Sequence, residues 1–396
     1  MRILLVHCRY RLAGGEDAVF ETEATQLEQA GHDVVRVEFS NDDVSTETLF
    51  ARLKAGLETV WSRRAKTRLA HAIARHAPQV VHFHNTFPVV SPAAYFACAQ
   101  AGVPVVQTLH NFRLLCANAM FMRDGAICEA CAGGRFFNGV RHACYRDNRL
   151  ASGAVALMQY LHHGLGTYAR QVGRFIVLTE FARRKFVAGG LPAACLVVKP
   201  NSLAQDPGMG AGGGDYCLFV GRLSAEKGVH TLLEAWRQLP DVPLVVAGDG
   251  PERAAMERQL AAAGTSSVRL LGAVPRSEVL RLMGEARMLV MPSECYEGFP
   301  MTIVEAYSRG LPVLAAHIGS LGEVVVDGQT GRHFRSADAA DLASAVRVVN
   351  AAPAALAAMR ERARRRFLDL YGAPQNVAAL VDIYSSVARA TPIMHE

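Results

Sequence analysis

The sequence of 396 residues lacks an uninterrupted apolar run of the length that a membrane-spanning helix needs. Its two longest stretches without a charged residue are Asn85–Phe112 and Ala151–Ala169. Prolines and a glycine break the first, and the second contains two histidines, a glutamine and glycines. We therefore expect Ala151–Ala169 to form a buried core helix, with a helix lying on a membrane surface as the alternative.

Two other features are missing. No basic stripe interleaved with aromatic residues occurs, so the sequence gives no support to nucleic-acid binding. The N-terminus runs directly into the strand-like segment RILLVHC, without the apolar region and cleavage site of a signal peptide. We expect a cytoplasmic protein, either free or held peripherally at the inner face of the membrane.

Positive charge is concentrated in the first half of the chain. Residues 1–200 contain 23 Lys or Arg against 15 Asp or Glu, and the remaining residues contain 19 against 21. A basic surface suits an anionic acceptor or membrane head groups, and scattered solvated charges are the alternative.

Short apolar strands alternate with helical stretches in two series, one from Arg2 to Thr179 and one from Tyr216 onward. This pattern predicts an α/β protein with two Rossmann-like parallel-sheet domains. The glycine-rich tract Ala204–Asp215 between them is typical of a flexible linker. Three of its glycines have the spacing of a dinucleotide fingerprint, but they follow no strand and open no helix, so we discard that interpretation. A basic cluster at 360–366 in the helical tail is expected to be a solvated face.

Ligands of open α/β sheets bind at the carboxyl ends of the strands, so the residues that follow each strand are the candidates. Glycines at a helix start let a backbone approach a phosphate, and two cations neutralise a diphosphate leaving group without a metal. The candidates found in this way are Gly14, Gly15 and Glu16, then His110, then Arg222 and Lys227, and then Gly248 to Pro251.

The segment Glu294–Ala315 predicts a loop, a helix and a buried strand, with Pro300 at the first turn of the helix. Glu297 falls on the loop and Glu305 about two turns into the helix. Two interpretations stay open at this point. The two carboxylates either accept hydrogen bonds from sugar hydroxyls beside a phosphate at the helix start, or they are solvated ends of an ordinary helix.

In this order along the chain, the motifs resemble the family 4 retaining glycosyltransferases of GT-B fold. The motifs that carry the resemblance are Gly14-Gly15-Glu16, His110 at a strand end, VVKPNS, FVGRLSAEKG, AGDGPE, the Glu297 and Glu305 pair, GLPVLA and GSLGEVVVDGQTG.

The resemblance implies two Rossmann-like domains facing across a cleft. Residues 1–200 would form an acceptor-side domain with a cysteine-rich insert at 111–150, and residues 201–373 a nucleotide-sugar-binding domain. A final helix is expected at 374–396, with a return to the first domain as one placement.

The resemblance also implies roles for single residues. The positions of Arg222 and Lys227 bind the diphosphate, Glu305 holds the ribose hydroxyls, and Glu297 and His110 lie near the donor sugar, so His110, Arg222, Lys227 and Glu297 are the expected catalytic residues. No catalytic metal is expected. The expected donor-binding residues are Gly14, Gly15, Gly221, Arg222, Lys227, Gly248, Gly250, Val274, Glu297, Gly298, Phe299, Met301, Thr302 and Glu305, and the expected acceptor-side residues are Glu16, His84, Asn85 and Asn111.

Two positions depart from the family pattern. Pro300 stands where glycine is frequent, so a phosphate contact there would fall to the N–H groups of neighbouring residues. Asn111 follows His110 where an aspartate is frequent in the family. This difference concerns how the acceptor would be bound.

Four cysteines in the insert, Cys116, Cys128, Cys131 and Cys144, have the spacing C-x11-C-x2-C-x12-C. Four thiolates can close a tetrahedral zinc site, with His142 as a substitute ligand. The second Cys-x-x-Cys pair of many zinc sites is missing, so structural zinc and reduced, unliganded cysteines both stay open.

The sequence therefore predicts a retaining, nucleotide-sugar-dependent glycosyltransferase of hexosyltransferase type. Its acceptor would be a hydroxyl of a glycan, a lipid-linked molecule or a small molecule. The alternatives are a catalytically silent GT-B docking subunit, and an epimerase or phosphorylase of the same fold.

Overall fold

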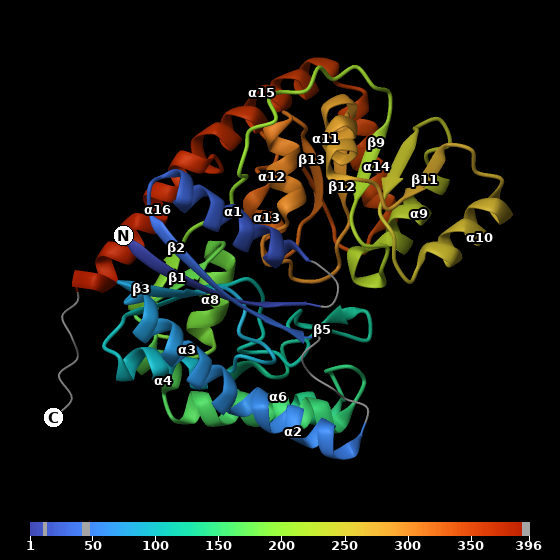
Figure 1. Cartoon of the computed structure of the whole chain (residues 1–396). Helices are drawn as coiled ribbons and strands as arrows, with labels where there is room; N and C mark the ends of the chain where they lie inside the picture. Colours follow the sequence, from blue (N-terminus) through green and yellow to red (C-terminus); the bar gives the residue numbers. More distant parts are fainter. Residues whose placement is uncertain (11–13, 42–47, 390–396) are drawn as a thin grey trace. The chain divides into compact units, whose positions relative to one another are not determined.

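The computed structural model describes residues 1–10, 14–41 and 48–389 (Figure 1). The chain forms two compact units. Unit 1 consists of Met1–Phe121, Glu129–Ala204 and Ala373–Glu396, and unit 2 consists of Met122–Cys128 and Gln205–Gly372.

A six-stranded parallel sheet with the order β2-β1-β3-β4-β7-β8 forms the centre of unit 1. In β1, six consecutive residues from Ile3 to Cys8 are buried, as expected of a strand covered on both faces. The strands are β1 (Arg2–Arg9), β2 (Asp33–Ser40), β3 (Val80–Phe83), β4 (Val105–Leu109), β7 (Arg174–Val177) and β8 (Leu196–Val198).

The C-terminal helix α16 (Ala373–Arg389) belongs to the core of unit 1. Leu380, Ile383 and Tyr384 pack in one cluster with Ile3 and Phe20. The other helices of this unit are α1 (Gly15–Gln29), α2 (Leu49–Val60), α3 (Arg63–His76), α4 (Ala93–Gln100), α5 (Phe137–Arg141), α6 (Arg149–Gly164), α7 (Thr167–Gln171) and α8 (Glu180–Ala188).

Unit 2 contains a second six-stranded parallel sheet, with the order β11-β10-β9-β12-β13-β14. The two sheets confirm the predicted fold class. The strands are β9 (Cys217–Val220), β10 (Leu244–Ala247), β11 (Val268–Gly272), β12 (Met288–Met291), β13 (Val313–Ala316) and β14 (Gly331–Phe334). The helices are α9 (Val229–Arg237), α10 (Arg253–Ala263), α11 (Arg276–Glu285), α12 (Met301–Ser308), α13 (Leu321–Val324), α14 (Ala339–Asn350) and α15 (Pro353–Leu370).

The glycine-rich tract is docked against unit 2, and the prediction of a flexible linker was wrong. The N–H groups of Gly210 and Gly212 donate to the carbonyl oxygens of Arg309 and Gly284, each at 2.9 Å. A Cβ atom at Gly210 would lie 2.3 Å from the backbone of Gly284. These glycines therefore serve close backbone packing.

The basic cluster on α15 helps to hold this tract. Arg360 donates to the carbonyl oxygen of Gly210 at 3.0 Å, and Arg364 donates to both carboxylate oxygens of Asp206 at 2.6 Å. The prediction of a solvated face is therefore wrong for these two residues.

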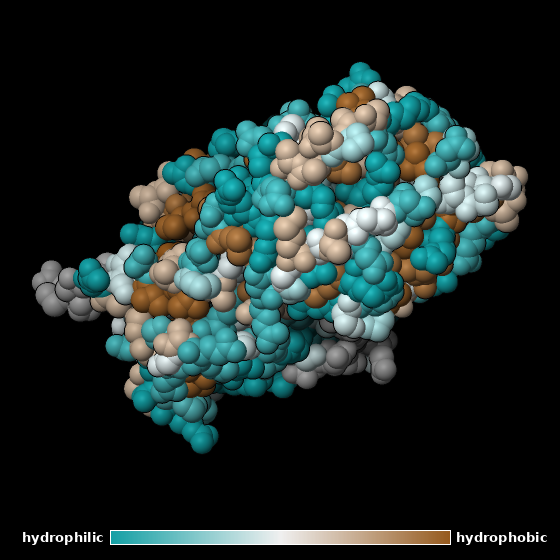
Figure 2. All heavy atoms as spheres, turned by 90° about the horizontal axis from the view of Figure 1, so that it is seen from above, coloured by the Kyte–Doolittle hydropathy of each residue, from teal (hydrophilic) through white to brown (hydrophobic). Residues whose placement is uncertain are grey.

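Helix α6 overlaps the stretch Ala151–Ala169 that we expected to be buried, but only one of its faces is covered. Val155, Met158 and His162 are buried, whereas Leu150 and Leu157 are exposed. On the face of the molecule shown in Figure 2, hydrophobic residues form separate groups among hydrophilic ones.

No single helix of the described chain has both the length and the apolar character needed to cross a membrane. The segments Ala339–Asn350 and Pro353–Arg389 meet that criterion only jointly, across a bend of 97°.

Candidate active site

A mostly buried ion pair lies at the carboxyl ends of two neighbouring strands of unit 2. Lys227 ends the short helix η4 (Ala225–Lys227) after β9, and Glu297 lies in the loop after β12. The Nζ atom of Lys227 donates to Oε1 of Glu297 at 2.6 Å, and the Ser293 hydroxyl donates to the same oxygen at 2.7 Å. Burial alone would raise the pKa of Glu297, but the Lys227 charge and these hydrogen bonds lower it. Both side chains are therefore held in their charged forms.

The second carboxylate, Glu305 on α12, is also covered. Its Oε1 accepts a hydrogen bond from Nε of Arg276 at 3.0 Å, and its side chain is 13% exposed. Burial raises the pKa of Glu305, and the Arg276 charge opposes that rise. The Glu297 side chain is 11% exposed. The interpretation of two solvated carboxylates is therefore wrong.

Glycines allow the loops after β9 and β10 to approach each other. A Cβ atom at Gly248 would lie 1.8 Å from the carbonyl oxygen of Gly221, and one at Gly250 would lie 2.4 Å from that of Leu223. Gly248 also has a φ of 151°, which L side chains rarely adopt. The packing of the two loops by itself requires these glycines.

The other predicted donor residues of unit 2 lie on loops and the first turn of α12. Arg222 is exposed between β9 and η4, and Val274 is half-buried between β11 and α11. Phe299 is buried, and its ring centroid lies 5.7 Å from that of Tyr371, so this side chain packs in the core. Gly298 precedes it, and Met301 and Thr302 begin α12 after the N-cap Pro300.

In unit 1, Asp17 connects the predicted glycine loop to the sheet. Its Oδ2 accepts from the backbone N–H of Gly14 at 2.7 Å, and its Oδ1 lies 2.8 Å from Nε2 of His7. A Cβ atom at Gly15 would meet no atom of the described residues within 4 Å, so none of them fills the space beside this glycine. Asp17 was not predicted from the sequence, although an acidic residue at the third position of a helix is a capping signal.

Unit 1 contains a pocket with about 430 Å³ of empty space, part of it open to solvent. The Asn111 amide donates to Oε1 of Glu16 there at 2.5 Å. Burial raises the pKa of Glu16 to about 7 from its ordinary 4.5. A carboxyl group of this kind can either donate to or accept from a hydroxyl at neutral pH. The structure brings all four predicted acceptor-side residues and His110 to this pocket: Glu16, His84, Asn85, His110 and Asn111 line it.

A buried chain of polar groups continues inward from His110. Its Nε2 lies 3.2 Å from Nδ1 of His84, and Nε2 of His84 faces Oε2 of Glu23 at 3.5 Å. The other oxygen of Glu23 accepts from Nζ of Lys199 at 2.7 Å. Burial lowers the pKa of His110 to about 3 and holds that of His84 well below its usual value. Both imidazoles are therefore neutral at pH 7.

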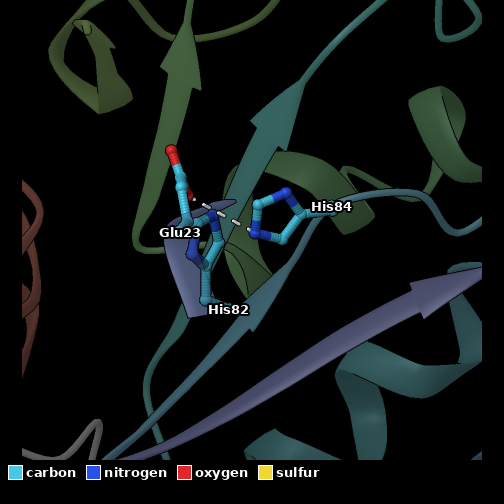
Figure 3. Close-up of side chains that lie close together, drawn as sticks. All are labelled: Glu23, His82 and His84. Carbon is cyan, nitrogen blue, oxygen red and sulfur yellow. Dashed lines mark ion pairs between the residues drawn. The ribbon is translucent and has the colours of Figure 1, made fainter. Parts of the chain in front are cut away.

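Glu23, His82 and His84 offer ligand atoms that lie within 4.8 Å of one another (Figure 3). Metal sites use two histidines and a carboxylate in this way. Here both ring nitrogens of His82 are hydrogen-bonded to hydroxyl groups, one of them that of Tyr384 at 2.8 Å. A cation would also be repelled by the Lys199 ammonium group, which is paired with Glu23. Hydrogen bonding and charge therefore account for the cluster.

The positions of the protons on His84 and His110 follow from the contact between His84 and Glu23. Among the described residues, Nε2 of His84 and Oε2 of Glu23 have no other hydrogen-bond partner, and two lone pairs facing each other in a buried site would repel. His84 therefore carries its proton on Nε2, and its bare Nδ1 accepts the Nε2–H of His110. The His110 ring is left with an unprotonated Nδ1, which is a hydrogen-bond acceptor.

Two family models together match most of the chain. The model of the glycosyl transferase 4-like domain matches residues 11–202, and that of the glycosyl transferases group 1 matches residues 210–366. The chain belongs to the group 1 glycosyltransferases. The family named by the sequence motifs is thereby confirmed.

Curated relatives of this glycosyltransferase match it over part of its length. A glycogen synthase of Mycobacterium tuberculosis is 35% identical over 182 residues, which are 43% of this chain and 42% of that protein. An O-antigen chain mannosyltransferase B of Escherichia coli is 34% identical over 160 residues, which are 38% of this chain and 40% of that protein. The matched segments thus span less than half of these relatives.

Solved structures resemble this glycosyltransferase over nearly the whole chain. Anabaena HepE in complex with UDP aligns with a TM-score of 0.70 at 17% identity, covering 98% of this chain and 100% of that chain. A sucrose-phosphate synthase of Thermosynechococcus elongatus aligns with a TM-score of 0.71 at 18% identity and the same coverage. At this level of identity the likeness establishes the GT-B fold.

The cysteine-rich insert of this glycosyltransferase does not assemble the predicted zinc site. Within the described part of the chain, which includes all four cysteines, no three of their sulfur atoms lie within 4.8 Å of one another. Cys131 packs instead with Phe136 and Ala156, and Cys144 packs against a separate apolar cluster. Apolar contacts therefore distribute these side chains between different parts of the insert, and the zinc interpretation has no support.

Glu23 and Lys199 are further site residues that sequence analysis missed. Lys199 stands in VVKPNS, one of the motifs that carried the resemblance, so its position was marked but its partner was not. The two residues are 176 positions apart. A lysine among apolar residues before a proline was the available signal for a buried charge.

Proposed function

We propose that this chain is a retaining glycosyltransferase that takes a sugar from a UDP-sugar and transfers it to an acceptor hydroxyl. The observation that carries the proposal is the Lys227–Glu297 ion pair at the strand ends of unit 2, within the segment that matches the group 1 family model. Structural neighbours support a uridine donor, since Anabaena HepE was solved with UDP and with UDP and glucose.

In this proposal, residues 201–373 bind the donor. Arg222 and Lys227 bind the diphosphate and neutralise the charge that develops on it as the glycosidic bond breaks, which is why no catalytic metal is required. N–H groups of the first turn of α12 add hydrogen-bond donors. Glu305 accepts hydrogen bonds from the ribose hydroxyls, and Glu297 holds Lys227 and faces the donor sugar.

Residues 1–200 hold the acceptor in the pocket lined by Glu16 and His110. The unprotonated Nδ1 of His110 accepts a hydrogen bond from a sugar hydroxyl, and it stays uncharged when the diphosphate departs. The acceptor oxygen attacks from the face that the diphosphate leaves, through an oxocarbenium-like state, and a phosphate oxygen takes the acceptor proton. The anomeric configuration is then retained. The acceptor is a hydroxyl of a glycan, a lipid-linked molecule or a small molecule.

The test is release of nucleoside diphosphate from a panel of UDP-, GDP-, ADP- and dTDP-sugars, with the product anomer assigned by NMR. We expect turnover of a UDP-sugar in the presence of a chelator, with retained configuration. Glu305→Ala should raise the KM for the donor, because the ribose hydroxyls lose their acceptor. Glu278→Ala on neighbouring α11 is the matched control, since this glutamate pairs only with exposed Arg281 among the described residues.

Release of nucleoside diphosphate from no donor, together with the absence of donor binding, would favour a silent docking subunit. Conversion of a nucleotide sugar without an acceptor would favour an epimerase. Either result would contradict the proposal.

A further inference from the structure

Exposed hydrophobic side chains gather on three neighbouring helices of unit 1. Among the described residues, eight of thirteen exposed large hydrophobic side chains lie on α2, α5 and α6 or at their ends. Helix α6 packs against both α2 and α5, and Figure 1 shows α2 beside α6. We call this region the α2–α6 surface and define it by its six leucines: Leu53, Leu57, Leu150, Leu157, Leu161 and Leu165.

Beyond its first residue, Arg149, helix α6 carries no charged side chain. Leu150, Leu157 and Leu161 recur at helical spacing, and Leu150 is 74% exposed. Between Arg149 and Arg170 the sequence contains no Asp, Glu, Lys or Arg. A helix face that meets only water normally carries charged or polar residues. The composition of this face of α6 is typical of a helix face that contacts another apolar surface.

Helix α2 extends the same surface. A Cβ atom at Gly56 would lie 3.4 Å from the Cβ of Ala154, so the two helices lie close together at this point. Leu53 and Leu57, one turn apart, are 56% and 67% exposed. On the other side of α6, Phe137 of α5 is 64% exposed. The apolar side chains therefore continue from one helix to the next.

Positive charge predominates in the segments that contain these side chains. Residues 49–60 and 135–170, which contain the surface, include seven Lys or Arg and two Asp or Glu. Lys54, Arg146 and Arg149 are exposed. A second copy of this chain would bring an equal positive charge against them, which disfavours a symmetric dimer through this surface. An apolar surface with a basic rim matches an anionic lipid bilayer.

We propose that the α2–α6 surface docks this protein on an anionic membrane, with the leucines in the boundary between head groups and acyl chains and the basic residues against lipid phosphates. Together with the proposed function, on which this step rests, the surface narrows the acceptor class to a lipid-linked hydroxyl presented at the bilayer. Docking would confine the enzyme to the surface where such an acceptor is embedded and would raise its local concentration.

The test is flotation of the full-length protein with vesicles of phosphatidylcholine alone or mixed with phosphatidylglycerol. We expect binding to the mixed vesicles that weakens as salt is added. The triple variant Leu150→Glu, Leu157→Glu and Leu161→Glu should bind at least about tenfold more weakly, because it loses apolar contact area and gains repulsive charge. The double variant Lys54→Glu and Arg149→Glu should lose the preference for the anionic lipid.

Matched controls use exposed residues of unit 2. Val348→Glu with Leu370→Glu, and separately Arg258→Glu, should leave vesicle binding unchanged. All variants alter exposed positions, and thermal unfolding checks that they fold. Wild-type protein that does not float with anionic vesicles, or a triple variant that floats as well as wild type, would overturn the proposal. So would a wild-type dimer that the triple variant dissociates.

Vesicle binding needs no donor, so its failure is separable from failure of the proposed function. If donor turnover persists and vesicle binding is absent, only the membrane inference fails. If the protein binds vesicles but turns over no donor, the membrane-docking proposal is supported and the proposed activity is contradicted.

Discussion

Lys227 and Glu297 form a mostly buried ion pair, with Nζ of the lysine 2.6 Å from Oε1 of the glutamate. Burial lowers the pKa of Lys227, but the Glu297 carboxylate more than offsets this and raises it. The pair therefore keeps a positive charge in place before any ligand arrives. A diphosphate that binds Lys227 shares it with Glu297, so the two residues should be coupled in stability and in function.

The first prediction concerns this coupling. Lys227→Met should destabilise the fold by about 1 to 3 kcal/mol, because it leaves Glu297 covered and unpaired. Adding Glu297→Gln should recover part of that loss without restoring turnover. Denaturant unfolding measures the first effect and diphosphate release the second. Equal stability of the single and double variants would show that the pair is not coupled.

The second prediction concerns pH. The pKa of Glu16 is about 7 in the folded state against an ordinary 4.5, so between these values the folded protein retains a proton that the unfolded chain releases. Stability should therefore fall as pH rises through this window, by about 1 to 3 kcal/mol relative to Glu16→Gln. Unfolding curves of the two proteins across the window test this. A constant difference between them would show that the Glu16 pKa is not raised.

The third prediction concerns the tautomers of His84 and His110. Both rings should stay neutral from about pH 6 to 8 and carry their protons on Nε2. Ring 15N chemical shifts report both properties directly. Glu23→Gln combined with Lys199→Met keeps the buried site uncharged but removes the carboxylate that fixes the proton of His84, so the tautomer populations should become mixed. A proton on Nδ1 of His110 in the wild-type protein is incompatible with the assignment.

The fourth prediction concerns the glycine tract. Gly210→Ala should destabilise unit 2 by about 1 to 3 kcal/mol, because its Cβ would overlap the backbone of Gly284. Gly153→Ala on α6 is the control: its Cβ would meet nothing within 4 Å, so it should be neutral or stabilise by up to about 1 kcal/mol. Thermal unfolding of both variants distinguishes a docked tract from a flexible linker, for which neither substitution would destabilise the protein.

Much of the fold was predictable because buried parallel strands have a simple sequence pattern. The run from Ile3 to Cys8 is apolar apart from His7, the strand Val313–Ala316 is apolar throughout, and the structure places both in sheets. Glycine was harder to interpret. Composition alone does not separate a flexible glycine tract from one that packs closely, because the outcome at Gly210 depends on Gly284, which is distant in sequence.

Residues of the candidate site were predictable where they follow a strand, as His110 does directly and Lys227 does after a short helix. The residues that contact and orient them were not predictable. Glu23 meets Lys199 across 176 positions, and His82 meets Tyr384 of the last helix across 302 positions. The first pair depends on the residue after β8 reaching α1, and the second depends on the return of α16 to the core of unit 1. No local spacing encodes either of them. The cysteine spacing misled for the same reason, because it does not determine which apolar cluster each side chain joins.

The measurement that tests the central claim most directly is calorimetric titration of UDP in the presence of a chelator. Wild-type protein should bind UDP, and the double variant Lys227→Met with Glu297→Gln should bind about ten to a hundred times more weakly, since a charge-assisted contact to phosphate is lost. Arg258→Ala, on exposed α10, should bind like wild type. Equal affinity of the double variant and wild type, or no UDP binding by either, would contradict a donor site built on Lys227.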